Sequence, residues 1–254
     1  MKPSRKRLRL WAVLFWLLVW QGVSAALDTA YPYGVLLLAS PLAVLTRLCA
    51  LAATTAFWQT LGTSAVRILG GFLLSCVLAA VLAALSARFA RVEELLAPPV
   101  AVIKSVPVAS FIILALVWLD SSSLSLFIAA LMVFPPVYGN VLEGAHRTDP
   151  ALLEMAQVFR VPPARTLHGI YLPQVLPYFR AAAGTALGLC WKAGTAAEVI
   201  GLCHGAIGER LYTAKVYFQT SDLFAWTVVI VLLSALFERL FLRVLDALAE
   251  RWCV

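Results

Sequence analysis

Residues Glu143–Pro173, EGAHRTDPALLEMAQVFRVPPARTLHGIYLP, form a polar interruption between two long apolar runs. The prolines in this stretch predict its local structure. Pro150 suits the first turn of a helix with Asp149 as its N-cap, which predicts a short helix at Ala151–Phe159. The run Val161–Pro163 must then be extended, because a residue before proline disfavours the helical region.

Pro163 suits the first turn of a second helix, which we expect at Ala164–Leu172. Pro173 is expected to mark the junction between this helix and the next apolar run. The polar interruption is therefore predicted to be a helix–turn–helix that lies along one face of a membrane.

Composition places the rest of the chain in a bilayer. Hydrophobic residues make up 62% of the sequence and charged residues 13%, against about 45–50% and about 25% in soluble domains. Backbone polar groups in lipid must be paired within the protein, so spans are helices or closed barrels. Barrel strands alternate apolar and polar residues, whereas these runs are continuously apolar. The sequence predicts an all-α membrane protein.

A helix needs about 20 apolar residues to cross a bilayer. About six runs qualify, and we expect one transmembrane domain over residues 1–254. The predicted spans are Leu10–Ala26, Leu61–Ala87, Val100–Leu119, Leu124–Val141, Val175–Ile200 and Leu223–Leu242.

The distribution of basic residues predicts the orientation of the chain. The net charge of +7 is concentrated at the start, in residues 2–9, and at the ends of apolar runs. This distribution is typical of the positive-inside rule and not of nucleic-acid binding. With a cytoplasmic N-terminus, four spans return residues 143–173 to the cytoplasm. The apolar segment Gly34–Trp58 is then expected to lie outside, as part of an outer loop with an interfacial helix at residues 28–60.

The first run has a second interpretation. Its basic start, apolar core and small residues at Val23-Ser24-Ala25 also fit a cleavable signal peptide. Cleavage near residue 25 would leave the remaining topology unchanged. Either way we expect a multi-pass protein of the cell (plasma or inner) membrane.

Motif spacing within the polar interruption resembles the EAA signature of ATP-binding-cassette (ABC) importer permeases. Two positions depart from it, because Met155 replaces the first alanine and Arg160 replaces a glycine. The positions that match are Glu154, Ala156, Ile170, Leu172 and Pro173.

Further motifs extend the resemblance to the nitrate/sulfonate/taurine subfamily. They are Leu37–Pro41, Ser64-x-x-Arg67-x-x-x-Gly71-Phe72, Lys104-x-Val106-Pro107, Phe134-Pro135, Ala196-Ala197-Glu198 and Asp222–Ala225. The resemblance implies a type I importer permease that binds ABC ATP-binding subunits inside and a substrate-binding protein outside. It implies a homodimer, although the sequence leaves a heterodimer open. Residues 143–173 would be the ATPase-coupling loop, with Glu154, Ala156, Arg160, Ile170, Leu172 and Pro173 as its coupling residues.

Arg160 raises a question of backbone conformation. The family glycine suits a left-handed residue at a helix C-terminus. We expect the Val161–Pro163 break to end the helix without a positive φ, so that Arg160 keeps ordinary backbone angles.

Three charged residues lie in or beside apolar runs, where such groups mark either a substrate path or structural ion pairs. Lys192 and Glu198 are about 120° apart around a helix and are not expected to pair with each other. Lys192 would suit an anionic cargo. Lys104 is expected to snorkel to the cytoplasmic surface.

We expect no catalytic site and no bound cofactor or metal. The sequence has no phosphate-binding Gly-rich loop, so ATP and Mg²⁺ would be used by the partner ATPase. A membrane-embedded enzyme or a secondary transporter is the alternative from a different class. The cargo stays open among nitrate, sulfonates, taurine, thiamine or its precursors, and other small metabolites.

Overall fold

The computed structural model describes residues 10–252, and every regular element within them is a helix. The basic segment 1–9, which motivates the cytoplasmic N-terminus, lies outside the described residues. The helices are α1 (Leu10–Ala30), α2 (Gly34–Leu37), α3 (Pro41–Ala52), α4 (Thr55–Arg88), α5 (Ala90–Ser105), α6 (Val108–Ala115), α7 (Ser121–His146), α8 (Pro150–Val158), α9 (Pro163–Thr166), η1 (Leu167–Tyr171), α10 (Leu172–Ile200), α11 (Ile207–Val216) and α12 (Thr220–Trp252).

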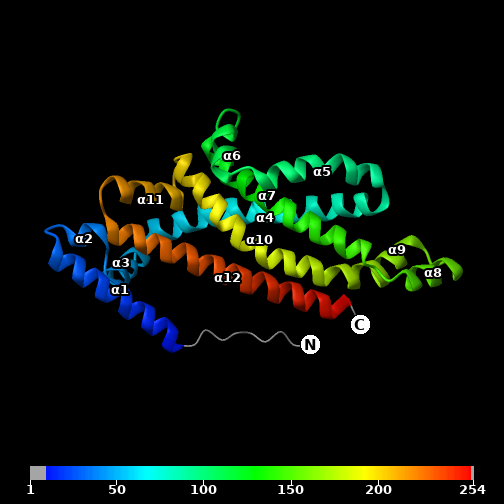
Figure 1. The fold of residues 1–254 in the computed structure, drawn as a ribbon, viewed down its shortest axis with the longest axis horizontal. Coiled ribbons are helices and arrows are strands. Elements are labelled where there is room, and N and C mark those ends of the chain that lie inside the picture. The colour runs from blue at the N-terminus through cyan, green and yellow to red at the C-terminus, as the bar shows by residue number, and fades with distance from the viewer. Residues whose placement is uncertain (1–9, 253–254) are drawn as a thin grey trace.

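Four long helices, α4, α7, α10 and α12, form an elongated bundle (Figure 1). Their shared core contains the buried side chains of Ile68, Phe72 and Trp191. Small residues allow the helices to approach closely. A Cβ on Gly71 would overlap the Leu126 carbonyl oxygen, and one on Gly194 would lie 2.7 Å from Ile68 Cγ1.

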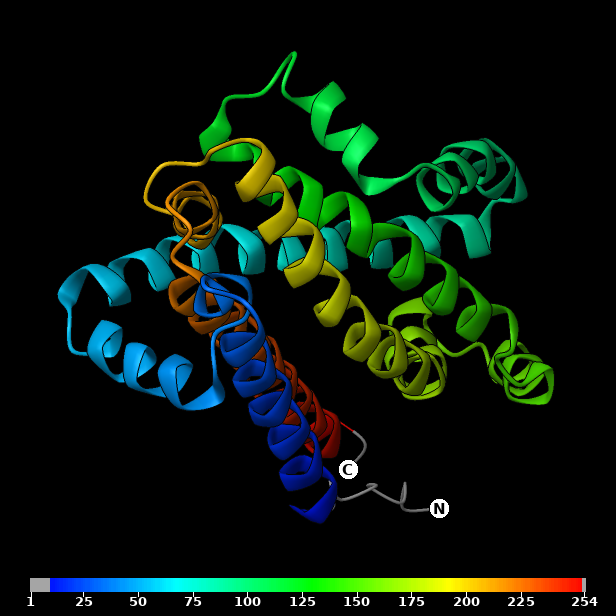
Figure 2. The same cartoon turned by 60° about the vertical axis from the view of Figure 1, so that its left-hand side comes forward.

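The bundle has two distinct ends. Helices α8 and α9 lie at one end, and α2, α3 and α11 lie at the other (Figures 1 and 2). We call these the α8 end and the α11 end. The segment 28–60 therefore lies opposite the 143–173 segment, as the sequence predicts, and it contains the expected short apolar helix, α3.

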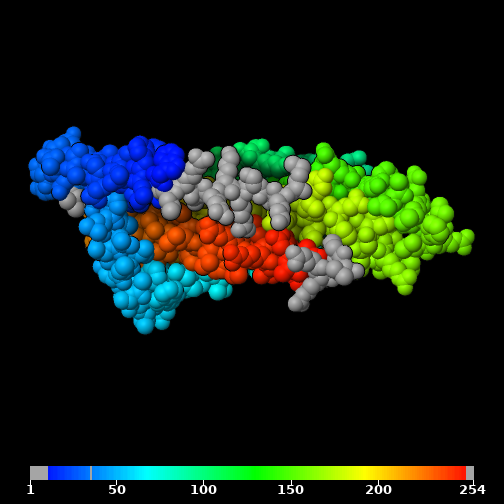
Figure 3. Space-filling model, turned by 90° about the horizontal axis from the view of Figure 1, so that it is seen from below, coloured from blue at the N-terminus to red at the C-terminus, as the bar shows by residue number. Residues whose placement is uncertain are grey.

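Helix α1 joins the bundle near the α11 end. Trp20 Nε1 donates to the Ala39 carbonyl at 3.0 Å, and the Trp20 ring contacts Phe224 of α12. Much of the rest of α1 is exposed, including Trp11 and Leu18. In the space-filling view it lies along one edge of the molecule (Figure 3).

Three of the described helices, α1, α4 and α7, are long and apolar enough to cross a membrane, or four spans if α5 and α6 count as one. Helices α10 and α12 are as long, with 29 and 33 residues, but charged side chains such as Arg180, Glu198 and Glu238 interrupt them. Five of the six predicted spans thus correspond to single long helices, and hydropathy alone identifies three of these five.

The predicted span at Val100–Leu119 is not one continuous helix. Helix α5 begins at Ala90, ends at Ser105, and meets α6 at an angle of 105°. Val106 is extended (φ −82°, ψ 134°) because it precedes Pro107, which caps α6. The sequence contained this proline, but the prediction gave more weight to the continuous hydropathy around it.

Candidate functional site

Helix α8 is held at the tip of the bundle by the chain that enters it. The Asp149 carboxylate accepts a hydrogen bond from the Ala151 amide at 2.9 Å, which confirms the predicted N-cap. The Asp149 amide donates to Gln174 Oε1 of α10 at 2.9 Å. Beneath it, Gly144 of α7 packs on the Tyr178 ring of α10. The start of α8 is therefore fixed to both α7 and α10.

The C-terminus of α8 corrects the prediction for Arg160. Its φ is 49°, in the left-handed region. The Val161 amide donates to the Ala156 carbonyl at 2.8 Å and the Arg160 amide to the Gln157 carbonyl at 3.1 Å. These two bonds define a Schellman motif with Arg160 at C′, the position that favours glycine. The proline run follows the motif and does not replace it.

One face of α8 exposes apolar side chains. Val158 and Phe159 are 78% and 75% exposed, and Leu152 and Met155 share the same side of the helix at helical spacing. Glu154 is exposed, and among the described residues its carboxylate has no hydrogen bond or ion pair. Ala156 is buried. We call Leu152, Glu154, Met155, Val158 and Phe159 the α8 face.

The second half of the segment merges with α10. Residues 163–166 form the short α9, and the chain continues through the π-helical turn η1 directly into α10. The predicted helix at Ala164–Leu172 is therefore present, as α9 and η1, but no break separates it from α10. Pro173 lacks an amide proton, and the π turn, in which Leu172 donates to the Leu167 carbonyl, lets the helix continue across it. Ile170, Leu172 and Pro173 thus lie where the 143–173 segment joins α10.

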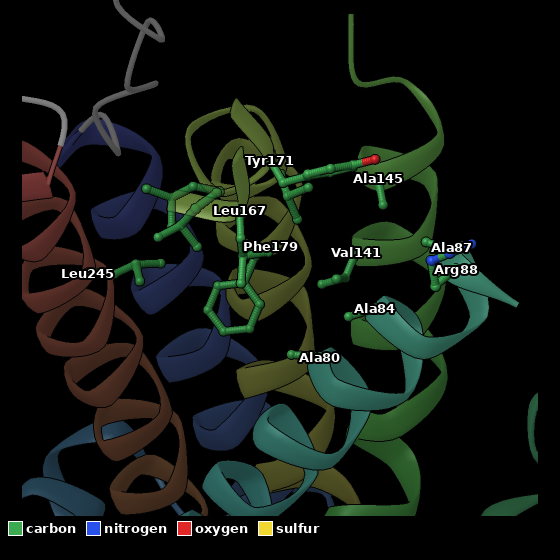
Figure 4. Close-up of a pocket in the computed structure, with 13 residues that line it drawn as sticks. Ala80, Ala84, Ala87, Arg88, Val141, Ala145, Leu167, Tyr171, Phe179 and Leu245 are labelled. Carbon is green, nitrogen blue, oxygen red and sulfur yellow. The ribbon is translucent and has the colours of Figure 1, made fainter. Parts of the chain in front are cut away.

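A cavity of about 480 Å³ lies between η1, the start of α10, and helices α4, α7 and α12. In Figure 4, alanines of α4 face larger side chains of α10 and α12 across this space. Arg88 and Tyr171 provide its polar groups. A helix bordered by unfilled space can shift more easily than one packed on every side. The cavity therefore gives η1 and the first turns of α10 room to move.

The three charged residues occupy different environments. Glu198 is fully buried, whereas Lys192, on the same helix, is exposed, so the two side chains do not pair. Lys104 lies at the end of α5, and its ammonium is 4.0 Å from where a Gly139 Cβ would lie. This position is about 21 Å along α5 from Ala90. Lys104 is therefore near the middle of the bundle and not at the α8 end that the snorkelling prediction requires.

Sequence reasoning missed the partners of Glu198. Ser64 of α4 donates to Glu198 Oε2 at 2.8 Å, and Arg67, one turn on, lies within electrostatic range of the carboxylate. The Gly208 amide of α11 donates to the same oxygen at 3.2 Å. Ser64 and Arg67 belong to a motif quoted above. Their polarity inside an apolar run was the signal that could have identified them.

Between α10 and α12, residues 207–216 form helix α11. Tyr212, Tyr217 and Phe218 are exposed on or just after it. At its start, the Gly205 amide donates to the Glu209 carboxylate at 2.7 Å, and this bond lowers the pKa of Glu209.

This fold defines a class of protein: a helical membrane permease that presents a short helix with an apolar face at one end of its bundle. The chain belongs to the family described as binding-protein-dependent transport system inner membrane component, whose model matches residues 76–252. It is thus a transport subunit of an ABC importer and not an enzyme.

Named relatives are similar over most of the chain. The putative aliphatic sulfonates transport permease protein SsuC of Escherichia coli is 30% identical over 82% of this chain and 81% of its own. SsuC of Bacillus subtilis is 27% identical over 72% of this chain and 66% of its own. The bicarbonate transport system permease protein CmpB of Synechococcus elongatus is 24% identical over 72% of this chain and 66% of its own. These names support the nitrate/sulfonate/taurine-like subfamily.

Proposed function

We propose that this permease moves a small anion into the cytoplasm by alternating access, driven by a separate ATP-binding subunit that docks on the α8 face. The observation that carries the proposal is α8 itself. Its start is fixed to α10 while Leu152, Glu154, Met155, Val158 and Phe159 are exposed. An amphipathic helix with an exposed apolar face suits a groove on a partner.

The orientation follows from this assignment. The α8 end faces the cytoplasm, and the α11 end receives cargo from an extracytoplasmic substrate-binding protein. Exposed aromatic side chains near α11 suit such a contact, because tyrosine and tryptophan are enriched at protein interfaces. The N-terminus is then cytoplasmic, and two copies of the permease would enclose the path.

An anionic cargo has two lines of support. Aliphatic sulfonates and bicarbonate, the cargoes in the relatives' names, are anions. A cavity of about 260 Å³ at the α11 end is lined in part by two arginines and one carboxylate, Arg47, Arg210 and Asp222. Thiamine precursors or other small metabolites are the alternative cargo class.

Uptake by proteoliposomes tests the proposal. The permease would be reconstituted with the ATP-binding subunit and binding protein of its own transporter, and ATP-dependent accumulation of ethanesulfonate, taurine, nitrate and bicarbonate would be compared with that of thiamine. Accumulation of one anion that needs ATP and the binding protein is expected. ATP-dependent accumulation of thiamine would reject the anion, and accumulation without ATP would reject the ABC mechanism.

A further inference from the structure

A buried polar cluster joins three helices at the α11 end. Glu198 and Ser64 are each 0% exposed. Ser64 Oγ donates to Glu198 Oε2 and accepts a hydrogen bond from the Ile207 amide, both at 2.8 Å. The Gly208 amide donates to Glu198 Oε2 at 3.2 Å. One serine from α4 and one glutamate from α10 thus bind the first two amides of α11.

This arrangement replaces the usual helix cap. The first amides of a helix have no partner within it and are normally satisfied by the N-cap side chain. The N-cap of α11 is Ala206, which provides no such side chain. The carboxylate of Glu198 also lies at the positive end of the α11 dipole. Helix α11 is therefore capped by its neighbours, and moving it away would leave both buried groups and its own amides unpaired.

Backbone contact strengthens this attachment. A Cβ on Gly208 would overlap the Cβ and carbonyl carbon of Glu198. The two helices therefore touch without an intervening side chain, which only glycine allows. Burial, hydrogen bonds and close packing together make α11 part of the same rigid body as the ends of α4 and α10.

Helix α10 connects this cluster to the other end of the molecule. It runs without a break for 29 residues, from Leu172 beside η1 to Ile200, two residues beyond Glu198. At 1.5 Å per residue this is about 43 Å. The helix that begins at the base of the 143–173 segment therefore ends where α11 is capped.

We propose that Glu198 is a positioning residue that makes α11 move with α10 and α4, so that the α11 end opens by displacement of this unit and not by α11 acting as an independent lid. The inference rests on the proposed function, because the movement would start at the α8 face. Lys192 has no part in this cluster. Glu198 thereby acts in coupling and not in binding the transported solute.

Substitutions of Glu198 and Ser64 separate the role of their hydrogen bonds from the role of the carboxylate charge. Glu198→Gln keeps an oxygen that can accept from Ser64 and Gly208, whereas Glu198→Ala removes both bonds. Ser64→Ala is the second variant: it truncates a smaller side chain, and it removes the acceptor of the Ile207 amide and the donor to Glu198. Ser75→Ala is its matched control: Ser75 lies three turns further along the same face of α4, is 2% exposed, and its hydroxyl has no hydrogen-bond partner among the described residues.

Amide hydrogen exchange in the assembled transporter measures the attachment directly. Loss of one buried hydrogen bond should speed exchange of residues 207–210 by about tenfold or more. We expect this acceleration in Glu198→Ala and Ser64→Ala, but not in Glu198→Gln or Ser75→Ala. Basal ATP hydrolysis should stay unchanged in all four variants. Its stimulation by the loaded binding protein, and solute uptake, should both fall about tenfold in Glu198→Ala and Ser64→Ala.

The outcomes distinguish the inference from the function on which it rests. If exchange accelerates while stimulation and uptake stay normal, α11 can move independently and the inference is overturned. Unchanged exchange in Ser64→Ala and Glu198→Ala would overturn it as well. If the wild-type transporter shows no ATP-dependent uptake, the proposed function fails, and the exchange data still report whether the three helices form one unit. If Glu198→Ala does not assemble, Ser64→Ala decides between these outcomes.

Discussion

Replacing Arg160 by glycine should stabilise the permease. A left-handed conformation costs a non-glycine residue about 1–2 kcal/mol, and Arg160 has a φ of 49°. Glycine avoids this cost but loses about 0.4–1 kcal/mol more conformational entropy on folding. The Arg160 side chain makes no hydrogen bond or ion pair with the described residues, so its removal costs no contact within the chain. The balance is a gain of about 0.5–1 kcal/mol.

Thermal unfolding of the detergent-purified chain, followed by tryptophan fluorescence, measures this gain as a rise of about 1–4 °C. The control is Arg160→Ala, which removes the same charge and length but keeps a Cβ at positive φ. The two variants then differ in the backbone strain, which glycine relieves, and in conformational entropy, of which glycine loses more on folding. The glycine variant should melt above the alanine variant. Equal melting temperatures, or a higher one for alanine, would refute the assignment of strain to this position.

Other predictions concern both ends of the bundle. Glu154→Lys should lower uptake about tenfold without lowering membrane insertion, whereas Gln157→Lys, on the same short helix, should have a smaller effect; equal uptake by both variants would remove the special role of Glu154. Cysteine introduced at Gln157 should react with an impermeant maleimide only from the cytoplasm, and one at Lys215 only from outside; the reverse pattern would invert the topology. Asp222→Asn should cost about 0.5–1 kcal/mol of stability by breaking the half-exposed pair with Arg47, and adding Arg47→Ala should cost little more. If the losses of stability in the two single variants add up in the double variant, the ion pair contributes nothing to stability.

The parts of the fold that local chemistry determines were predictable from the sequence. Pro150 and Asp149 start α8 as expected, because fixed φ and an N-cap oxygen act within a few residues. The long apolar runs are helical, as predicted, because backbone groups in lipid must be paired within the protein. The errors arose where two local signals competed. At Val106-Pro107 the proline prevailed over hydropathy, and at Arg160 a helix end of the glycine type formed although prolines follow it.

The buried cluster could not be predicted because it depends on helices far apart in the sequence. Helical periodicity correctly separated Lys192 from Glu198, but it could not show which of the two would be buried. That depends on Ser64, 134 positions away, and on a glycine in α11. Tertiary partners of an intramembrane charge are set by packing, and one sequence reports only that such partners are needed.

Arg160 is one of three non-glycine residues with positive φ in the described part of the chain, together with Leu202 and Phe218 at the α11 end. Phe218 repeats the Schellman geometry at the end of α11, and its ring is 71% exposed. Strained residues cluster at functional sites, so we interpret the phenylalanine as being kept for a contact outside the chain. Phe218→Gly should then stabilise the isolated permease by about 0.5–1 kcal/mol while weakening its complex with the binding protein, measured by co-sedimentation with proteoliposomes. Exposed Tyr212 of the same helix, changed to alanine, controls for loss of an aromatic surface without relief of strain. A glycine variant that binds the partner as tightly as wild type would leave the strain at Phe218 without a functional reason.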